Sequence, residues 1–255
     1  MSLSADLVVV SDVHLLHTED QRGSRLIEVI GQCASGTVAN FVMLGDIFDI
    51  CLGNHRYFQR KFAKLGEALT QLANAGTNVF YIEGNHEFRI DGLAWSKVNF
   101  ITEGSLSLEI SEKRYLFEHG DLIYSHDRYK KFRKFIKSRA VTETLRFFPG
   151  KLLDRLATGS AKVSRAQDEY REINHDKILS HAWGWLESGG ADRGIFGHFH
   201  VPYAEIDPTN PKRGLYSVSS WDEPSVLVLK DDEFFRWYVA RHGDPQLTET
   251  KPVCR

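Results

Sequence analysis

Five clusters of Asp, Asn and His residues are spread over the first 200 positions, and most of them directly follow a short apolar run. Apolar runs of this length, rich in Val, Ile and Phe, predict buried strands, here at 7–10, 41–44, 79–82, 115–117 and 195–196. Ligands of such sheets bind beyond the carboxyl ends of the strands, so we expect the clusters to converge on one crevice. The clusters are Asp12-Val13-His14, Gly45-Asp46, Gly84-Asn85-His86, His119-Gly120-Asp121 and Gly197-His198-Phe199-His200.

The order of elements around these runs predicts an α/β fold with two sheets. Residues 22–32 and 57–75 have the length and apolar spacing of helices, and Gly76 is a suitable stop for the second one. A strand-helix-strand-helix-strand order favours parallel strands joined by right-handed crossovers. After residue 200 the connections are short and predict antiparallel strands. These later strands are expected at 203–206, 215–219, 226–229 and 235–239.

Residues 126–165 differ in charge from the rest of the chain. They contain twelve Lys or Arg and only three acidic residues, whereas the whole chain has a net charge of −2. Apolar residues recur at helical spacing, for example Phe132, Phe135, Phe148 and Leu152, with a break expected at Pro149-Gly150. This pattern predicts a basic, amphipathic helical insertion. The small overall charge and the apolar character of the basic segment argue against nucleic acid as a partner.

The cysteines and the absence of long apolar stretches indicate the cell compartment. Three widely spaced cysteines offer neither a zinc knuckle nor a disulfide framework, which fits a reducing cytosol. The first residues lack the features of a signal peptide, and no stretch approaches the ~18–20 apolar residues that cross a bilayer. We therefore expect a cytoplasmic protein. The basic insertion leaves open a peripheral contact with the anionic inner face of the cytoplasmic membrane, and the sequence leaves the oligomeric state open.

Each cluster taken alone is typical of an ordinary turn or a hydrogen-bonded histidine. Taken together, seven ligand-type residues would have to fall at strand ends by chance, so we interpret them as a metal site. Carboxylate and imidazole ligands without thiolates favour Mn²⁺, Fe²⁺ or Zn²⁺ over Ca²⁺, and Mn²⁺ is our first choice. Asp121 and Glu87 are either supporting residues of this site or solvated turn residues.

The five motifs resemble the signature set of the calcineurin-like metallophosphoesterases over about three quarters of the chain. The resemblance implies a four-layer αββα sandwich, with residues 1–255 forming one domain and a helical lid inserted at about 126–176. It also implies a dinuclear phosphoesterase with two divalent metal ions bridged by Asp46. Its pattern gives one ion the ligands Asp12, His14, Asp46 and His200, and the other ion the ligands Asp46, Asn85, His119 and His198.

From His119 onward the chain resembles the UDP-2,3-diacylglucosamine pyrophosphohydrolases of lipid A biosynthesis. The matching text is HGDLIYSHDRYKKFR, followed by FFPGKLLDRLATGSAKVSR in the insertion. The resemblance implies hydrolysis of a nucleotide-lipid diphosphate to UMP and 2,3-diacylglucosamine 1-phosphate, beside a lid that accepts acyl chains. It further implies that Asp127, Ser164 and Arg171 contact substrate.

One position departs from that lipid-hydrolase pattern. Those enzymes commonly carry Arg where this chain has His86, whereas phosphatases and phosphodiesterases of the wider superfamily carry His. A histidine oriented by Asp49 could act as general acid for an alkoxide leaving group, which a diphosphate substrate hardly needs. The alternative hypothesis is therefore a metallophosphatase or phosphodiesterase of broader specificity. A noncatalytic binding module is disfavoured, because every ligand position is filled.

Overall fold

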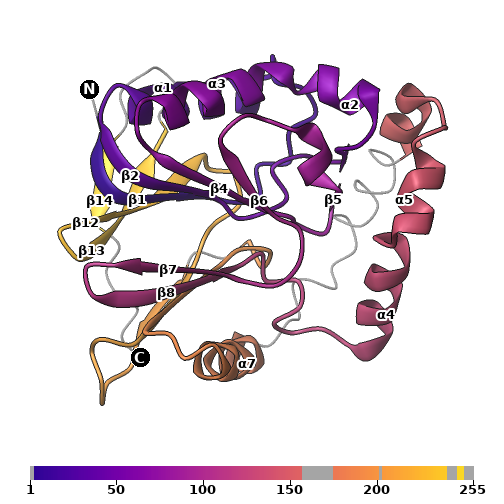
Figure 1. The fold of residues 1–255 in the computed structure, drawn as a ribbon. Helices are drawn as coiled ribbons and strands as arrows, with labels where there is room; N and C mark the ends of the chain where they lie inside the picture. The colour runs from indigo at the N-terminus through magenta and orange to yellow at the C-terminus, as the bar shows by residue number, and fades with distance from the viewer. Residues whose placement is uncertain (1–2, 157–174, 201–202, 240–245, 250–255) are drawn as a thin grey trace.

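Two β-sheets stack face to face in the computed structural model, which describes residues 3–156, 175–200, 203–239 and 246–249 (Figure 1). In the larger sheet β1, β2, β4 and β6 are parallel, and β12, β13 and β14 continue it in antiparallel fashion. Its seven strands are, in spatial order, β14 (Gln246–Glu249), β13 (Glu233–Tyr238), β12 (Ser225–Lys230), β1 (Ser4–Val10), β2 (Thr37–Met43), β4 (Asn78–Ile82) and β6 (Val98–Ile101).

The smaller sheet has a parallel centre, β8-β9-β11, with an antiparallel strand at each edge. Its five strands are, in order, β10 (Tyr203–Ile206), β11 (Gly214–Ser217), β9 (Arg193–Phe196), β8 (Lys113–Glu118) and β7 (Leu106–Ile110). A two-stranded sheet of β3 (Cys51–Leu52) and β5 (Glu87–Phe88) lies near the carboxyl ends of β2 and β4. Parallel strands of both sheets therefore end in loops that carry the predicted motifs.

Helices cover the outer face of each sheet, which confirms the expected αββα order of layers. Helices α1 (Gln21–Ala34) and α3 (Ala63–Asn74) lie on the larger sheet, and α7 (His175–Ser188) lies on the smaller one (Figure 1). Three separate apolar clusters fill the three spaces between these four layers. Four packed layers thus hold the two sets of strand ends in fixed relation to each other.

The continuous apolar runs of the sequence follow from burial on both faces of the sheet. In β1, Val8 and Val10 pack toward the helices, whereas Leu7 and Val9 pack toward the smaller sheet. Successive side chains of a strand point to opposite faces, so a strand covered on both faces needs an apolar residue at every position. The strands that end at the site are therefore held from both sides.

One predicted helix is wrong in its extent. Residues 57–75 were expected to form a single helix, but the structure has α2 (Arg56–Lys61) and α3 with a break at Phe62, where φ is −111° and ψ is 15°. The Phe62 ring is fully buried and stacks on Phe48 with 3.9 Å between ring centroids. This tertiary contact accompanies the break between the two helices, although the apolar periodicity of the sequence continues through Phe62.

The short strands β3 and β5 and the last strand, β14, were not predicted from the sequence, and neither were β6 and β7.

β6 and β7 show why. Each lies at the edge of its sheet and has mostly half-buried or exposed residues, so neither contains a recognisable apolar run. A short 3₁₀ helix, η1 (Ile90–Leu93), precedes β6. The predicted strands after residue 200 exist, but β11 pairs with β9 in parallel, and β12 and β13 extend the larger sheet.

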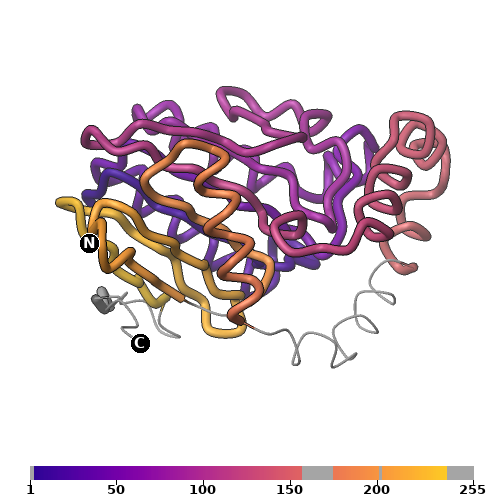
Figure 2. Tube along the Cα trace, turned by 90° about the horizontal axis from the view of Figure 1, so that it is seen from below, coloured from indigo at the N-terminus to yellow at the C-terminus, as the bar shows by residue number. Residues whose placement is uncertain are grey.

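The basic insertion is helical and stands at one end of the sandwich (Figures 1 and 2). It contains α4 (Asp127–Ile136) and α5 (Arg139–Leu145), and the chain is helical again over residues 150–156, after the expected break at Pro149-Gly150. Residues 157–174 of the predicted lid lie outside the described residues, and α7 already begins at His175.

Two further expectations concern the membrane and the thiols. In the part of the chain that the structure describes, none of the helices combines the length and the apolar character that a bilayer crossing requires. Cys33 and Cys51 are buried and form no disulfide with another described residue.

Candidate metal centre

The loops that follow β1, β2, β4, β8 and β9 bring the predicted ligands together at one end of the two sheets. The ligand atoms form three groups, and within each group all of them lie within 4.8 Å of one another. His14 belongs to two of the groups. Residues from loops of both sheets take part, so side chains up to 188 positions apart in the sequence lie close together. They are Asp12 with His14 and His200, His14 with Asp49 and His86, and Asp46 with His119 and His198.

Five of the predicted ligands have left-handed backbone conformations, which are rare outside glycine. This region costs about 1–3 kcal/mol for a residue with a side chain, although Asp and His tolerate it better than most. Such residues gather at functional sites, where the surrounding structure enforces them. The φ angles are 51° at Asp12, 52° at His14, 50° at Asp46, 69° at His198 and 59° at His200.

Two glycines allow the loops to approach the carboxylates. A Cβ atom on Gly197 would lie 2.1 Å from Ser11 Oγ and 2.6 Å from Asp12 Oδ2. A Cβ atom on Gly84 would lie 2.2 Å from Asp46 Oδ1. Because Cβ atoms do not approach other heavy atoms so closely, glycine is required at both positions for the loops to pack around the carboxylates.

The first group is organised around Asp12. Its Oδ2 accepts hydrogen bonds from Ser11 Oγ at 2.6 Å and from the His198 backbone N–H at 2.9 Å. Its Oδ1 is left 3.4 Å from His200 Nε2. His14 is only 7% exposed, yet neither of its ring nitrogens has a hydrogen-bond partner among the described residues. A buried imidazole normally needs such a partner, and a bound cation would supply it.

The second group is organised around Asp46. Its Oδ1 accepts the backbone N–H of His86 at 2.9 Å. Its Oδ2 lies 3.5 Å from His119 Nε2 and 3.8 Å from His86 Nε2. Burial raises the pKa of Asp46, but the imidazoles of His119 and His86 outweigh burial and hold that pKa well below its usual range. Asp46 is therefore an anionic oxygen ligand at neutral pH.

His119 directs one nitrogen into this group. Its Nδ1 donates to the Leu44 carbonyl at 2.9 Å, so Nε2 faces Asn85 Oδ1 at 3.0 Å and the Asp46 carboxylate. Burial lowers the pKa of His119, but the carboxylates of Asp46 and Asp12 raise it to about 10. Convergent lone pairs from a carboxylate, an amide and an imidazole suit a divalent cation, which would take the place of the imidazole proton.

Two other imidazoles are in the form that binds metals. Burial lowers the pKa of His14 to about 4, and burial together with the neighbouring His119 lowers that of His198 to about 4. Both rings are therefore neutral at pH 7, and a neutral imidazole is the ligand form of histidine. The residues present fit a pair of divalent cations in donor type, and His14 and His198 also fit in protonation.

His86 faces the same space from the loop after β4. Its Nδ1 donates to the main-chain carbonyl of Asp49 at 2.8 Å, which fixes the ring with Nε2 toward the Asp46 side. Asp49 was expected to orient His86, and the hydrogen bond that joins them runs through its main chain. The side chain of His86 is 25% exposed, more than that of Asp46 at 2%, so it can meet a substrate entering the site.

Glu87 and Asp121 are buried supporting residues, not solvated turn residues. Glu87 accepts hydrogen bonds from Tyr81 OH at 2.6 Å and from the backbone N–H groups of Ile47, Phe48 and Gly84. It therefore joins the loop after β2 to the loop after β4. Burial and the nearby Asp46 raise the pKa of Glu87 to about 7.

Other contacts to the motif loops were not foreseen from the sequence. Arg22 donates to the Val13 carbonyl at 2.9 Å and to Asp222 at 3.0 Å, and the Trp221 backbone N–H donates to the Asp12 carbonyl at 3.2 Å. These groups brace the first motif. No spacing signal distinguishes Arg22 or Trp221 from other residues of their type.

Of the three residues predicted to contact substrate, one lies in the described part of the chain. Asp127 is the first residue of α4 and is exposed. Ser164 and Arg171 lie outside the described residues.

The insertion next to the site exposes apolar side chains. Among the described residues, seven large hydrophobic side chains are exposed, and six of them belong to the insertion. The only other one is Leu16, near the first motif. The six are Phe132, Phe135, Phe147, Phe148, Leu152 and Leu156, with exposures from 47% to 85%. A concentration of this kind on one element marks an interaction surface for apolar groups.

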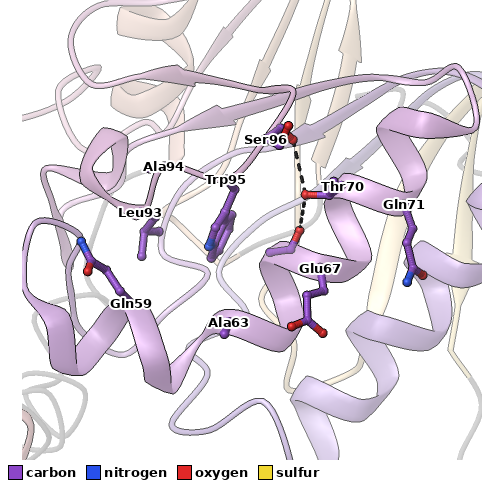
Figure 3. Close-up of a pocket in the computed structure, with 10 residues that line it drawn as sticks. Gln59, Ala63, Glu67, Thr70, Gln71, Leu93, Ala94, Trp95 and Ser96 are labelled. Carbon is purple, nitrogen blue, oxygen red and sulfur yellow. Dashed lines mark hydrogen bonds between the residues drawn. The ribbon is translucent and has the colours of Figure 1, made fainter.

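A separate surface pocket of about 520 Å³ lies between α3 and the loop around Trp95 (Figure 3). Thr70 on its wall donates to the Gly66 carbonyl at 2.7 Å. The residues that line this pocket belong to none of the five motifs, so it is not part of the metal centre.

Comparison with known proteins gives a family match and several relatives. The sequence profile described as calcineurin-like phosphoesterase matches residues 6–202. A UDP-2,3-diacylglucosamine hydrolase of Neisseria meningitidis serogroup B is 26% identical over 195 residues, which are 75% of this chain and 80% of that protein. The protein of the same name in Pseudomonas fluorescens is 25% identical over 250 residues, 94% and 98% of the two chains.

Among solved structures, a variant of Vps29 from Entamoeba histolytica aligns over 96% of this chain and 99% of its own. The TM-score is 0.49 and the sequence identity is 10%.

Proposed function

Because this chain belongs to the calcineurin-like phosphoesterase family, and is thus a metal-dependent phosphoester hydrolase, we propose that its substrate is UDP-2,3-diacylglucosamine. The products would be UMP and 2,3-diacylglucosamine 1-phosphate. Support comes from curated relatives that carry this activity in their names and align over most of the chain. The observation that carries the lipid part is the set of exposed apolar side chains on the insertion beside the metal centre.

We propose two metal sites, and the contacts already described support them. One ion would be held by Asp12, His14, Asp46 and His200, and the other by Asp46, Asn85, His119 and His198. Mn²⁺ is the proposed metal, because the donors are hard oxygens and imidazoles without thiolates. The bound ions would supply Lewis acidity toward the phosphoryl oxygens and toward the attacking water.

The chain's own groups prepare this chemistry in three ways. Ser11 and the His198 backbone N–H hold one oxygen of Asp12, so that the other oxygen points toward His200. The Leu44 carbonyl fixes the orientation of the His119 ring, so that Nε2 is the nitrogen directed into the site. The burial of Asp12 and Asp46 excludes water from the carboxylates and strengthens their interaction with cations.

His86 has a separate proposed role. With Nδ1 donating to the Asp49 carbonyl, a protonated His86 would present Nε2–H to the leaving group of a bound ester. A phosphate leaving group needs little protonation, because its second pKa is about 6, whereas an alkoxide does. His86 therefore extends the proposed activity toward simple phosphate esters as secondary substrates.

The insertion would bind the lipid part of the substrate. Phe132 and Phe135 are 57% and 66% exposed on α4, whose other face contacts the loops of the metal centre. Lysines and arginines of the same segment would contact anionic head groups, each contributing about 1 kcal/mol near a membrane surface. We further propose that Asp127, Ser164 and Arg171 contact the substrate. Peripheral association with the cytoplasmic membrane follows from the same arrangement and is part of the proposal.

The direct test is release of UMP from UDP-2,3-diacylglucosamine by purified protein loaded with Mn²⁺. We expect UMP and the lipid monophosphate in equal amounts, and no release by the protein after chelation. The matched control is a Glu19→Gln variant, which changes an exposed carboxylate that pairs with Lys64 and belongs to none of the five motifs, and it should keep full activity. Absence of UMP from protein that has bound two Mn²⁺ ions would reject the substrate, and rapid cleavage of nitrophenyl phosphate esters instead would support a broader phosphoesterase.

A further inference from the structure

Helix α4 of the insertion is oriented with its polar side toward the protein. Tyr129, Arg133 and Lys137 are spaced four residues apart and therefore lie on one side of the helix and its C-terminal cap. All three contact the core, whereas Phe132 and Phe135 are exposed. None of the ten residues of α4, all of which the structure describes, is buried. Polar contacts therefore dominate the attachment of this helix, since its apolar side chains are at most partly buried.

The first two contacts reach the loop after β8. Arg133 Nε donates to Asp121 Oδ2 at 2.5 Å, and Tyr129 OH donates to the same oxygen at 2.9 Å. The side chain of Asp121 is 1% exposed and that of Arg133 is 16% exposed. Asp121 follows the proposed ligand His119 by two residues, so α4 is attached directly to the loop that carries this ligand.

The third contact reaches the loop after β4. Lys137 Nζ donates to Glu83 Oε1 at 2.8 Å and to the Gly84 carbonyl at 2.6 Å. Both side chains are largely buried, with exposures of 11% for Lys137 and 4% for Glu83. Gly84 directly precedes the proposed ligand Asn85. One turn of α4 beyond Arg133, the chain is thus attached to a loop of the other sheet.

These contacts span the place where the two sheets meet. Asn85 comes from the larger sheet and His119 from the smaller one, and their side chains lie 3.0 Å apart. The contacts described above also join the two loops through α4, from outside the site. We propose that Arg133 and Lys137 are positioning residues that fix the separation of Asn85 and His119 and so set the affinity of the metal site these ligands share. This inference rests on the metal assignment of the proposed function.

The physical reason is that both ion pairs are partly withdrawn from water. A buried carboxylate that loses its partner is strongly destabilised, so Asp121 and Glu83 keep their cations close and hold α4 against both loops. Loss of groups that orient metal ligands typically weakens metal binding by about 10–100-fold. The proposal therefore predicts a larger effect on the ion held by Asn85 and His119 than on the other ion. In the described part of the chain no contact joins α4 to Asp12, His14 or His200, and the two ions share only Asp46.

The experiment is a titration of metal-stripped, full-length protein with Mn²⁺ by isothermal titration calorimetry. For Lys137→Met and for Arg133→Met, we expect one of the two ions to bind about 10–100-fold more weakly. The affinity of the other ion should change much less. Two controls keep the interpretation specific. Lys134→Met removes an exposed charge from the same helix, and Lys61→Met removes a buried ion pair with Asp154 that anchors the insertion elsewhere.

Both controls should bind two ions with unchanged affinity. Unchanged affinities in folded Lys137→Met and Arg133→Met variants would overturn the proposal. If the methionine variants do not fold, Lys137→Arg and Arg133→Lys keep the charge and displace the contacting atoms. A smaller weakening of the same ion is then expected, and unchanged affinity would again reject the inference.

The titration separates this inference from the proposed function. If the unmodified protein binds two ions but releases no UMP, the proposed substrate is wrong and the positioning role can still be measured. If the protein releases UMP and the variants bind both ions normally, the positioning role is wrong and the proposed function stands. If the unmodified protein binds no Mn²⁺, the metal assignment fails, and both proposals fail with it.

Discussion

Asp46 is the residue at which the proposed site is most sensitive to change. Its Oδ2 lies within 3.8 Å of two imidazoles, its Oδ1 accepts the backbone N–H of His86, and its backbone is left-handed. The side chain is 2% exposed, so no water can replace it without rearrangement of the loops.

We predict that Asp46→Asn weakens binding of both ions and abolishes turnover. Loss of a shared ligand should cost more than the about 10–100-fold that loss of an orienting group costs. Mn²⁺ titration and UMP release would check this prediction. Retention of even one tightly bound ion together with more than a tenth of the activity would contradict the bridging role.

A second prediction concerns Gly197 in the loop after β9. A Gly197→Ala variant should destabilise the fold by about 1–3 kcal/mol, the usual cost of overpacking, because the added Cβ would lie 2.1 Å from Ser11 Oγ. Metal binding through Asp12 should weaken at the same time. Gly31→Ala in α1 is the matched control, since nothing lies within 4 Å of the added atom. It should stabilise the protein by about 0.5–1 kcal/mol in urea unfolding.

At the scale of single residues, the proposed ligands could be identified from the sequence, but their supports could not. Asp12, Asp46 and His119 are polar residues just after apolar runs, and this placement can be recognised in the sequence alone. Arg133 and Lys137 are two of twelve basic residues in one segment, and only the fold distinguishes them from the exposed ones. Glu87 was left undecided, because burial of a carboxylate depends on donors that come from other loops.

At the scale of elements, apolar runs predicted the strands that are covered on both faces. β1, β2 and β4 are of this kind, whereas the edge strands β6 and β7 are half exposed and were missed. The break between α2 and α3 was also missed. Helical periodicity continues through Phe62, and only its stacking on Phe48 reveals where the chain turns. The apolar pattern of the sequence thus predicted strands that are buried on both faces. It failed for half-exposed strands and for a helix whose course depends on a tertiary contact.

The exposed face of α4 gives a prediction at this scale. A Phe132→Ser, Phe135→Ser double variant should keep the stability of the protein within about 0.5 kcal/mol, because both side chains are exposed on the free helix face. The KM for the diacylated substrate should rise by roughly tenfold or more, since burying one phenyl group is worth about 1.5–3 kcal/mol.

Hydrolysis of a nitrophenyl phosphate ester serves as the control for that double variant. It should be unaffected, because this small ester has no acyl chain to meet the lid. An equal loss on both substrates would indicate that the lid shapes the metal centre and does not bind lipid.

At the scale of the whole molecule, the histidines make the stability of the metal-free protein depend on pH in both directions. The pKa values of His14 and His198 are lowered from 6.5 to about 4, so the stability they contribute is lost as the pH falls from 6.5 to 4. The pKa of His119 is raised to about 10, so its contribution is full below 6.5 and is lost as the pH rises through 10. The pKa of Glu87 is raised to about 7, so Glu87 increases stability as the pH falls from 7 to 4.5. This gain offsets the loss of stability caused by one of the two histidines, His14 or His198.

We therefore predict that the chelated protein is most stable near pH 6.5 and loses stability on both sides. Added Mn²⁺ should remove the alkaline loss, because a bound cation takes the place of the proton on His119. Thermal unfolding between pH 4 and 10, with and without Mn²⁺, would measure both effects. A melting temperature of the chelated protein that stays constant from pH 7 to 10 would contradict the assigned environment of His119.

Because α4 turns its polar side toward the protein, its detachment should respond differently to urea and to salt. Detaching a helix whose apolar side chains are at most partly buried exposes little new hydrocarbon to water, so urea should favour the detached state only weakly. Salt should favour it modestly, since the attachment is ionic but its ion pairs are partly buried and are screened less than surface pairs. Amide hydrogen exchange in α4 would then respond to ionic strength while the strands of both sheets respond to denaturant. The protein would then contain two cooperative units in one chain, and ionic strength would control the one that carries α4.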